Sequence, residues 1–208
     1  MIDDTKIRDY IISPNLSGED LTQEVVGVDQ LGNRTDISVI EERPLTIFLN
    51  NQEIVTAMTI GDYPEYLALG FLRNQKMLSN KDKVDAIDFD AELNSIVIRT
   101  KRKTNYEDKL KKKTQTSGCA VGTVFGDIMD GVDGLKISAI STKVSHLYSL
   151  SSKINRTPSL YLKAGAIHGT ILCHQDKPLV YMEDVGRHNA ADKIAGWIFD
   201  TGTNPRDK

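Results

Sequence analysis

Short runs of apolar and β-branched residues along the chain predict strands. Residues 44–49 and 95–99 have this composition, and Asn50-Asn51 after the first run supplies turn chemistry. Residues 167–173 and 179–185 form a second pair of runs, separated by a short polar turn. This spacing predicts a β-hairpin near the C-terminal end of the sequence.

Apolar positions that share one helical face predict three helices. The first follows Asp62, which is expected to cap it, and buries Leu67. Gly70 lies inside this helix, where it costs about 1 kcal/mol relative to alanine, so close packing against it is expected. The other two helices are predicted over residues 140–152 and 188–199. Their expected buried faces are Ile140, Val144, Leu147 and Leu150, and Ala190, Ile194, Trp197 and Ile198.

The alternation of strands and helices favours a layered α/β domain. Residues 1–32 are polar and are expected to form an N-terminal segment, and residues 33–208 a single domain. Within that domain, a lysine-rich stretch and a run of small residues predict a mobile loop over about 101–123.

The composition is typical of a globular protein and argues against several other classes. Hydrophobic residues make up 39% and charged residues 26% of the 208-residue chain. A net charge of −3 predicts no general affinity for nucleic acids or membranes, no apolar run approaches the roughly 20 residues of a membrane span, and no secretory signal is visible. Two cysteines without zinc-binding spacing predict free thiols in a reducing compartment such as the cytoplasm, and no metal site.

Charge is distributed unevenly along the chain. Between Lys101 and Lys113, seven basic residues against two acidic ones give a local charge of +5, which leaves −8 for the rest of the chain. A basic stretch in an otherwise acidic protein predicts an interaction with anions.

Cys119 is the candidate reactive thiol. It lies between Gly118 and Gly122, a few residues after the basic stretch. Nearby cations lower the pKa of a thiol and a loop exposes it, which are the conditions for a nucleophile or sulfur carrier. The alternative is a buried cysteine acting as a small apolar residue. Cys173 lies inside a predicted strand, where the core interpretation is favoured.

The densest polar cluster joins the end of a predicted strand to the start of the last helix, over residues 183–193. A helix N-terminus presents free backbone N–H groups to anions, so Arg187 and His188 would hold a phosphate that Gly186 allows to approach. A capped helix with a solvated first turn explains the spacing equally well. His168 is a lone histidine beside an apolar strand, a pattern that is more often structural.

Three blocks of this sequence, in order over most of the chain, resemble the FdhD family of formate dehydrogenase accessory proteins. The first comprises E-R-P-L-T-I-F-L-N at residues 42–50, A-M-T at 57–59 and L-A-L-G-F-L at 67–72. The second is the segment around Ser117-Gly118-Cys119. The third contains E-D-V-G-R-H-N-A-A-D-K at residues 183–193, a long and specific string.

This resemblance implies a sulfur carrier or sulfurtransferase. Such a protein accepts persulfide sulfur from a cysteine desulfurase and passes it to the bis-molybdopterin guanine dinucleotide form of the molybdenum cofactor, which is then inserted into formate dehydrogenase. The implied fold is similar to cytidine deaminase: a three-layer α/β/α arrangement with a mixed sheet and without the deaminase zinc. The resemblance also implies a homodimer.

The resemblance also assigns roles to residues. Cys119 would carry the persulfide, as the catalytic residue. The basic stretch would attract the anionic cofactor. The expected cofactor-binding residues are His168, Asp184, Gly186, Arg187, His188, Asn189 and Lys193.

The sequence departs from the family pattern in two ways. Many members have C-x-x-C in the loop, whereas Gly122 occupies the second position here, so one thiol is expected to carry the persulfide without an internal disulfide. Members also normally continue into a further strand–helix unit that helps to hold the cofactor. We therefore expect either a shortened sequence or a reduced member of the family.

Two other classes of function remain open from the sequence. The first is a non-catalytic chaperone that binds the molybdenum cofactor or the apo-formate dehydrogenase, with Cys119 incidental. The second is a hydrolase or deaminase, which would need a metal. One histidine and two distant cysteines are a weak ligand set for it.

Overall fold

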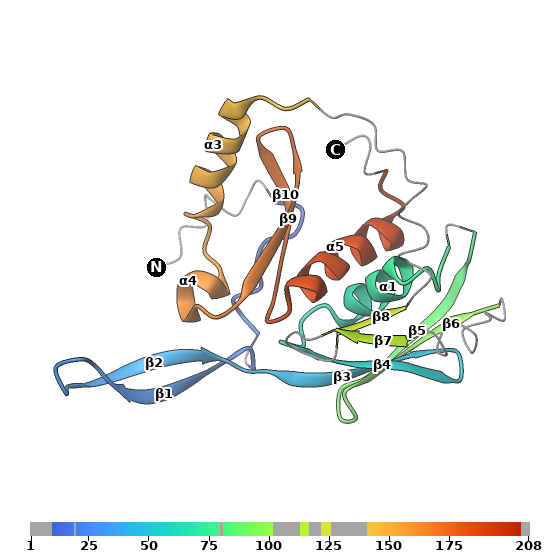
Figure 1. Ribbon diagram of the computed structural model, residues 1–208, viewed down its shortest axis with the longest axis horizontal. Coiled ribbons are helices and arrows are strands. Elements are labelled where there is room, and N and C mark those ends of the chain that lie inside the picture. Colours follow the sequence, from blue (N-terminus) through green and yellow to red (C-terminus); the bar gives the residue numbers. More distant parts are fainter. Residues whose placement is uncertain are drawn as a thin grey trace.

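The computed structural model describes residues 10–18, 20–79, 81–101 and 141–204, together with two short strands at residues 113–116 and 122–125. Four strands form a mixed sheet in the order β4-β3-β6-β5, which lies on one side of α1 and α5 (Figure 1). Its strands are β3 (Arg43–Leu49), β4 (Gln52–Thr59), β5 (Val84–Asp90) and β6 (Ser95–Thr100). β3 runs parallel to β6, and the two outer pairs are antiparallel.

Alternating side chains explain why these segments form a sheet with one covered face. Leu45, Ile47 and Leu49 of β3 are buried, while the residues between them are more exposed. This period of two matches the alternation of side chains along a strand. Ile96 and Ile98 continue the same apolar layer on β6. The strands predicted at residues 44–49 and 95–99 are thus confirmed.

Two helices, α1 (Pro64–Asn74) and α5 (Arg187–Thr201), lie side by side over the sheet (Figure 1). Leu67, Leu69 and Leu72 of α1 join the apolar core formed with the sheet. Both predicted helices are therefore confirmed. Ala190, Ile194 and Trp197 of α5 are buried as expected, and Ile198 is half-buried.

Two glycines allow α1 and α5 to approach closely. A Cβ added at Gly70 would overlap the backbone oxygen of Asp192, and one added at Gly196 would overlap the backbone oxygen of Tyr66. Neither helix backbone can yield to such an overlap without moving away from the other. The close packing expected at Gly70 is confirmed, with a matching glycine on the facing helix.

A β-hairpin covers the other side of α5. Its strands are β9 (His168–His174) and β10 (Lys177–Asp184), which pair antiparallel as the sequence predicts. Val180 and Met182 of β10 pack against Ile194 and Trp197 in a second apolar cluster. The end of β10 is thereby held beside the start of α5.

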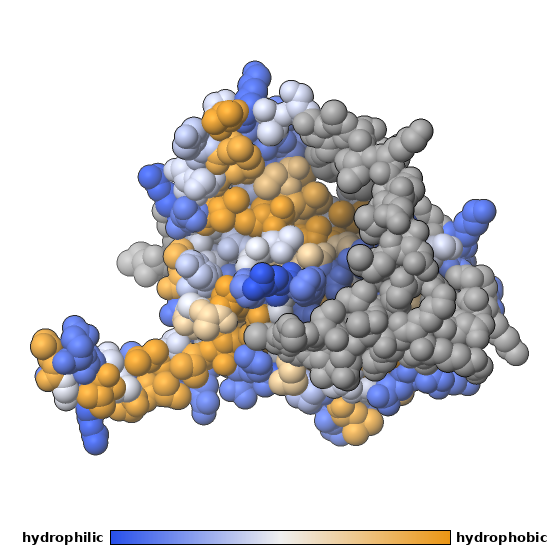
Figure 2. Space-filling model, in the orientation of Figure 1, coloured by the Kyte–Doolittle hydropathy of each residue, from blue (hydrophilic) through white to orange (hydrophobic). Residues whose placement is uncertain are grey.

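A second hairpin extends from the body of the protein (Figure 1). It pairs β1 (Thr22–Val28) with β2 (Arg34–Ile40). Residue 32, the predicted end of the N-terminal segment, lies in the turn between these two strands. Val26, Val28 and Leu31 are exposed on it, and Figure 2 shows apolar surface along this ribbon.

The helix predicted over residues 140–152 is observed as α3 (Val144–Ile154), but two of its expected buried residues are wrong. Val144 and Leu147 are 65% and 55% exposed, whereas Leu150 is half-buried and Ile140 lies outside the described residues. α3 leads into the short helix α4 (Leu160–Ala164), whose start is capped by the Ser159 side chain.

One further expectation needs correction. Asp62 does not cap α1: the capping position is Tyr63, in a left-handed conformation, and the Asp62 carboxylate instead pairs with Lys193. Within residues 101–123, for which the sequence predicts a mobile loop, β7 (Lys113–Thr116) pairs with β8 (Gly122–Phe125), and the mobility of this segment stays a prediction. No helix of the described segments is long and apolar enough to span a membrane.

The close crossing of α1 and α5 leaves no space for a side chain at Gly196. Helix propensity alone favours Gly196→Ala by about 1 kcal/mol. Overlap with the Tyr66 carbonyl should reverse that sign and lower the free energy of unfolding by about 2 kcal/mol or more. Chemical denaturation measures the change, with Ala191→Gly at an exposed site of α5 as a propensity control. A stabilised Gly196→Ala variant would contradict the close crossing.

The same interface holds a carboxyl group whose ionisation opposes folding. Burial raises the pKa of Asp192 to about 7, although the Asn74 amide donates a hydrogen bond to it (2.6 Å). The folded chain keeps this proton up to about pH 7, whereas the unfolded chain loses it near pH 4. Raising the pH through this window therefore removes stability.

Asp192→Asn keeps an oxygen acceptor for Asn74 and cannot ionise. The variant should match the wild type near pH 4 and exceed its free energy of unfolding by on the order of 2 kcal/mol at pH 8. Urea titrations across this range measure the difference, with Asp200→Asn at an exposed site of the same helix as the matched control. Parallel pH profiles for the wild type and Asp192→Asn would show that folding does not raise the pKa of this carboxyl group.

Candidate functional site

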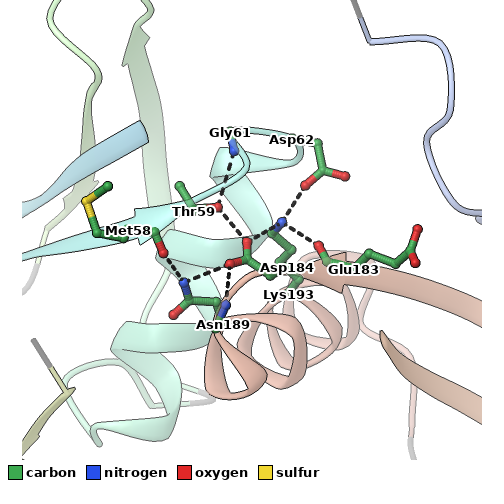
Figure 3. A network of polar contacts seen from close by, with 9 residues as sticks. Met58, Thr59, Gly61, Asp62, Glu183, Asp184, Asn189 and Lys193 are labelled. Atoms are coloured by element: carbon green, nitrogen blue, oxygen red, sulfur yellow. Dashed lines mark hydrogen bonds and ion pairs between the residues drawn. The ribbon is translucent and has the colours of Figure 1, made fainter. Parts of the chain in front are cut away.

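The polar cluster predicted at residues 183–193 lies where β10 ends and α5 begins. The segment from Met58 to Asp62, which comprises the end of β4 and the start of its connection to α1, packs against it (Figure 3). These two stretches are more than 120 residues apart in the sequence, so only the folded chain brings them together. Buried polar contacts join them.

Asp184 is at the centre of this network and has no exposed surface. Its Oδ1 accepts hydrogen bonds from the Gly186 N–H (3.1 Å) and the Asn189 amide (3.0 Å). Its Oδ2 accepts from the Thr59 hydroxyl (2.5 Å) and pairs with Lys193 Nζ (2.7 Å). A carboxylate offers about four lone-pair positions, so protein groups occupy all of them.

The side chain of Lys193 also binds only groups inside the protein. Its ammonium group is fully buried, donates hydrogen bonds to Asp62 and to the Glu183 carbonyl oxygen (2.9 Å), and forms an ion pair with Asp184. Two carboxylates and one carbonyl oxygen thus surround the charge. Burial raises the pKa of Asp62, against the lowering effect of Lys193. A buried lysine is tolerated here because charged and polar partners surround it.

Asn189 fixes the first turn of α5. Its Nδ2 group donates to the Met58 carbonyl oxygen (2.7 Å) and to Asp184, which uses both amide hydrogens. Gly186 occupies the capping position of the helix, and no side chain caps it. The position of the helix start is therefore set by Asp184 and Asn189 from within the protein.

Glu183 points to the other side of β10, as the alternation of a strand requires. Its carboxylate accepts hydrogen bonds from the backbone N–H groups of Leu160 (2.8 Å) and Tyr161 (3.1 Å) at the start of α4. Burial raises its pKa, while these two hydrogen bonds act in the opposite direction. Adjacent acidic residues thus anchor two different helices to the same strand.

Three of the predicted residues present their side chains to solvent beside this buried network. Arg187 and His188 are exposed in the first turn of α5. His168, also exposed, is the register partner of Asp184 at the start of β9, which brings it to the same end of the hairpin. Two histidines and an arginine near a helix N-terminus form an arrangement suited to an anion.

The predicted binding residues therefore separate into two groups. His168, Arg187 and His188 are accessible, and Gly186 contributes its backbone to the turn. Asp184, Asn189 and Lys193 face inward and bind protein groups, which sequence reasoning did not anticipate. It also missed Thr59 and Asp62 as their partners, although Thr59 lies within the A-M-T motif.

Cys119 lies outside the described residues. The strands on either side of it, β7 and β8, pair with Thr116 opposite Gly122. Cys173 is half-buried rather than in the core, and burial raises the pKa of its thiol. A raised pKa leaves Cys173 protonated and a poor nucleophile. The described residues hold no group of three or more His, Cys, Asp or Glu side chains placed to bind a metal ion.

Comparison with known proteins agrees with this arrangement of fold and motifs. The chain is 25% identical over 175 residues to a sulfur carrier protein FdhD from Listeria monocytogenes serotype 4b (strain F2365), covering 82% of this chain and 67% of the relative. It is 28% identical over 181 residues to a sulfur carrier protein FdhD from Bacillus subtilis (strain 168), covering 83% and 69%.

A solved structure shares the fold. It is described as a formate dehydrogenase accessory protein from Desulfotalea psychrophila, with 22% identity and a TM-score of 0.61, and the match covers 86% of this chain and 67% of that one. The fold class is thus mixed α/β, as in that structure. The profile of the FdhD/NarQ family matches residues 40–208, and the chain belongs to that family. It spans about two thirds of the length of these relatives.

The network predicts a large asymmetry between two neighbouring basic residues. Lys193→Met leaves Asp62 and Asp184 without their shared cation, so the free energy of unfolding should fall by about 3–5 kcal/mol. Arg187→Met removes an exposed charge and should change it by less than about 0.5 kcal/mol. Urea denaturation at pH 7.5 measures both. Equal midpoints for the two variants would contradict the buried network.

Proposed function

We propose that this chain carries sulfur for the maturation of formate dehydrogenase, with Cys119 as the carrier thiol. Its membership in the FdhD/NarQ family, and the names of the relatives that it resembles, support this assignment. The observation that contributes most from the structure is the internally fixed turn at the start of α5. It holds Arg187 and His188 at the surface beside His168.

We assign the exposed side of this turn to the phosphate groups of the cargo, the bis-molybdopterin guanine dinucleotide form of the molybdenum cofactor. The first N–H groups of a 15-residue helix favour an anion, and Arg187 supplies a planar guanidinium suited to a phosphate. Asp184 and Lys193 support the turn from behind, because their polar atoms are already occupied. The basic stretch between Lys101 and Lys113 adds a general attraction for anions.

The carrier step is a sulfur transfer between thiols. The Cys119 thiolate attacks the outer sulfur of a cysteine desulfurase persulfide, a new S–S bond forms on Cys119, and the desulfurase cysteine leaves as a thiolate. This exchange needs no external oxidant or reductant. Delivery of the sulfur as sulfide to the cofactor takes two electrons, which we assign to a thiol reductant, and returns Cys119 to its thiolate.

The remaining assignments follow the family resemblance. We propose a homodimer that works in the cytoplasm, with a cysteine desulfurase as the sulfur donor and formate dehydrogenase as the client. We also propose that the mixed sheet and its helices are part of a three-layer, cytidine deaminase-like fold.

Mass spectrometry after incubation with a cysteine desulfurase and cysteine tests the carrier step. We expect one added sulfur atom on Cys119, removed by a reductant and absent from Cys119→Ala. Cys173→Ala is the matched control and should gain sulfur as the wild type does, because burial keeps the Cys173 thiol protonated.

A folded chain that gains no sulfur on Cys119 in the presence of active desulfurase would rule out the carrier step. The protein would then be better described as a non-catalytic chaperone for the cofactor or for the apo-enzyme.

A further inference from the structure

We propose that Thr59 and Asp62 are positioning residues for the anion site at the start of α5. Neither residue belongs to the polar cluster of residues 183–193, and neither touches the proposed ligand. They act on the site through Asp184 and Lys193. This inference rests on the proposed function, since it concerns the shape of the turn that carries Arg187 and His188.

Thr59 connects the end of β4 to the network through a fully buried hydroxyl group. The hydroxyl donates to Asp184 Oδ2 (2.5 Å) and accepts from the Gly61 N–H (3.3 Å). Both functions of the hydroxyl are used, so its hydrogen has a defined direction. Thr59 thus ties the carboxylate of Asp184 to the backbone of the β4–α1 connection.

Asp184 transmits this constraint to the helix start. A carboxylate is planar and rigid, so fixing Oδ2 also fixes Oδ1. That second oxygen holds the Gly186 N–H and the Asn189 amide. The orientation of the first turn of α5 therefore depends on a hydroxyl group on a distant strand.

Asp62 supplies a second constraint from the same connection. It pairs with Lys193, which also binds Asp184 and the Glu183 carbonyl oxygen. Lys193 thereby links Asp62 to the end of β10. Asn189 adds a third link through the Met58 carbonyl oxygen. Two residues at the end of β4 and one in the β4–α1 connection thus each hold one residue at the end of β10 or in α5.

The chemistry of these links favours a positioning role over simple stabilisation. Well-packed apolar side chains often stabilise a protein interior as much as a buried ion pair does, because desolvation of the charges is costly. A fully satisfied polar network, in contrast, specifies one geometry. Such a network behind an exposed Arg187 and His188 is suited to hold backbone donors in place for a ligand.

The test compares Thr59→Val, which keeps the shape and removes the hydroxyl, with Thr59→Ser, which keeps the hydroxyl. The probe is guanosine diphosphate, which carries the guanine and diphosphate groups of the expected cargo, and calorimetry gives its Kd for the whole 208-residue chain. We expect about a 10-fold weaker Kd for Thr59→Val and a change of less than about 2-fold for Thr59→Ser. Circular dichroism establishes that each variant is folded at the titration temperature.

Asp62→Asn gives a second, independent test if Thr59→Val does not fold. It keeps an acceptor for Lys193 and removes one negative charge near the site. Electrostatics alone predicts tighter binding of guanosine diphosphate, whereas loss of positioning predicts weaker binding, by about 5-fold or more. The sign of the change therefore separates the two explanations.

Arg187→Ala distinguishes failure of this inference from failure of the proposed function. If the wild type binds, Arg187→Ala binds weakly and folded Thr59→Val binds like the wild type, the anion site stands and Thr59 has only a structural role. Tighter binding of the probe by Asp62→Asn would likewise show that Asp62 is not a positioning residue. If the wild type does not bind the probe, or Arg187→Ala binds unchanged, the proposed anion site fails and this inference fails with it.

Discussion

The buried ammonium group of Lys193 is the interaction on which the rest of this structure depends. An unpaired charge in the interior would cost more free energy than a domain of this size has to spare. Asp62, Asp184 and the Glu183 carbonyl oxygen surround it, so two carboxylates and a carbonyl dipole compensate the charge. The loop before α1, the end of β10 and the middle of α5 are held at one point. These contacts also fix the conformation of the surface turn between β10 and α5.

Lys193 meets Asp62 only because α1 and α5 can approach closely. Gly70 and Gly196 remove the side chains that would keep the two backbones apart. The apolar side chains of α1 then face the sheet, and those of α5 face the β9–β10 hairpin. Two glycines on facing helices thus connect the packing of the core with the electrostatics of the network, and a substitution at either should disturb both.

Local patterns in the sequence predict much of this fold. Runs of apolar and β-branched residues identify β3 and β6, the turn residues identify the β9–β10 hairpin, and the charged string at residues 183–193 marks the candidate site. The direction of the polar side chains is harder to predict. Asn189 and Lys193, four residues apart, share a helical face that borders the buried face of α5, and that spacing was the available signal. Their partners Thr59 and Asp62 could not be identified, because a contact across more than 120 residues leaves no local pattern.

Nuclear magnetic resonance shows directly whether an anion binds at the start of α5, because each backbone N–H group gives its own signal. Isotope-labelled protein is titrated with guanosine diphosphate, and the shift of each N–H resonance is followed. We expect saturable shifts centred on Gly186, Arg187 and His188, with a smaller response at His168 across the hairpin. Shifts that saturate elsewhere and leave the start of α5 unchanged would contradict the proposed anion site.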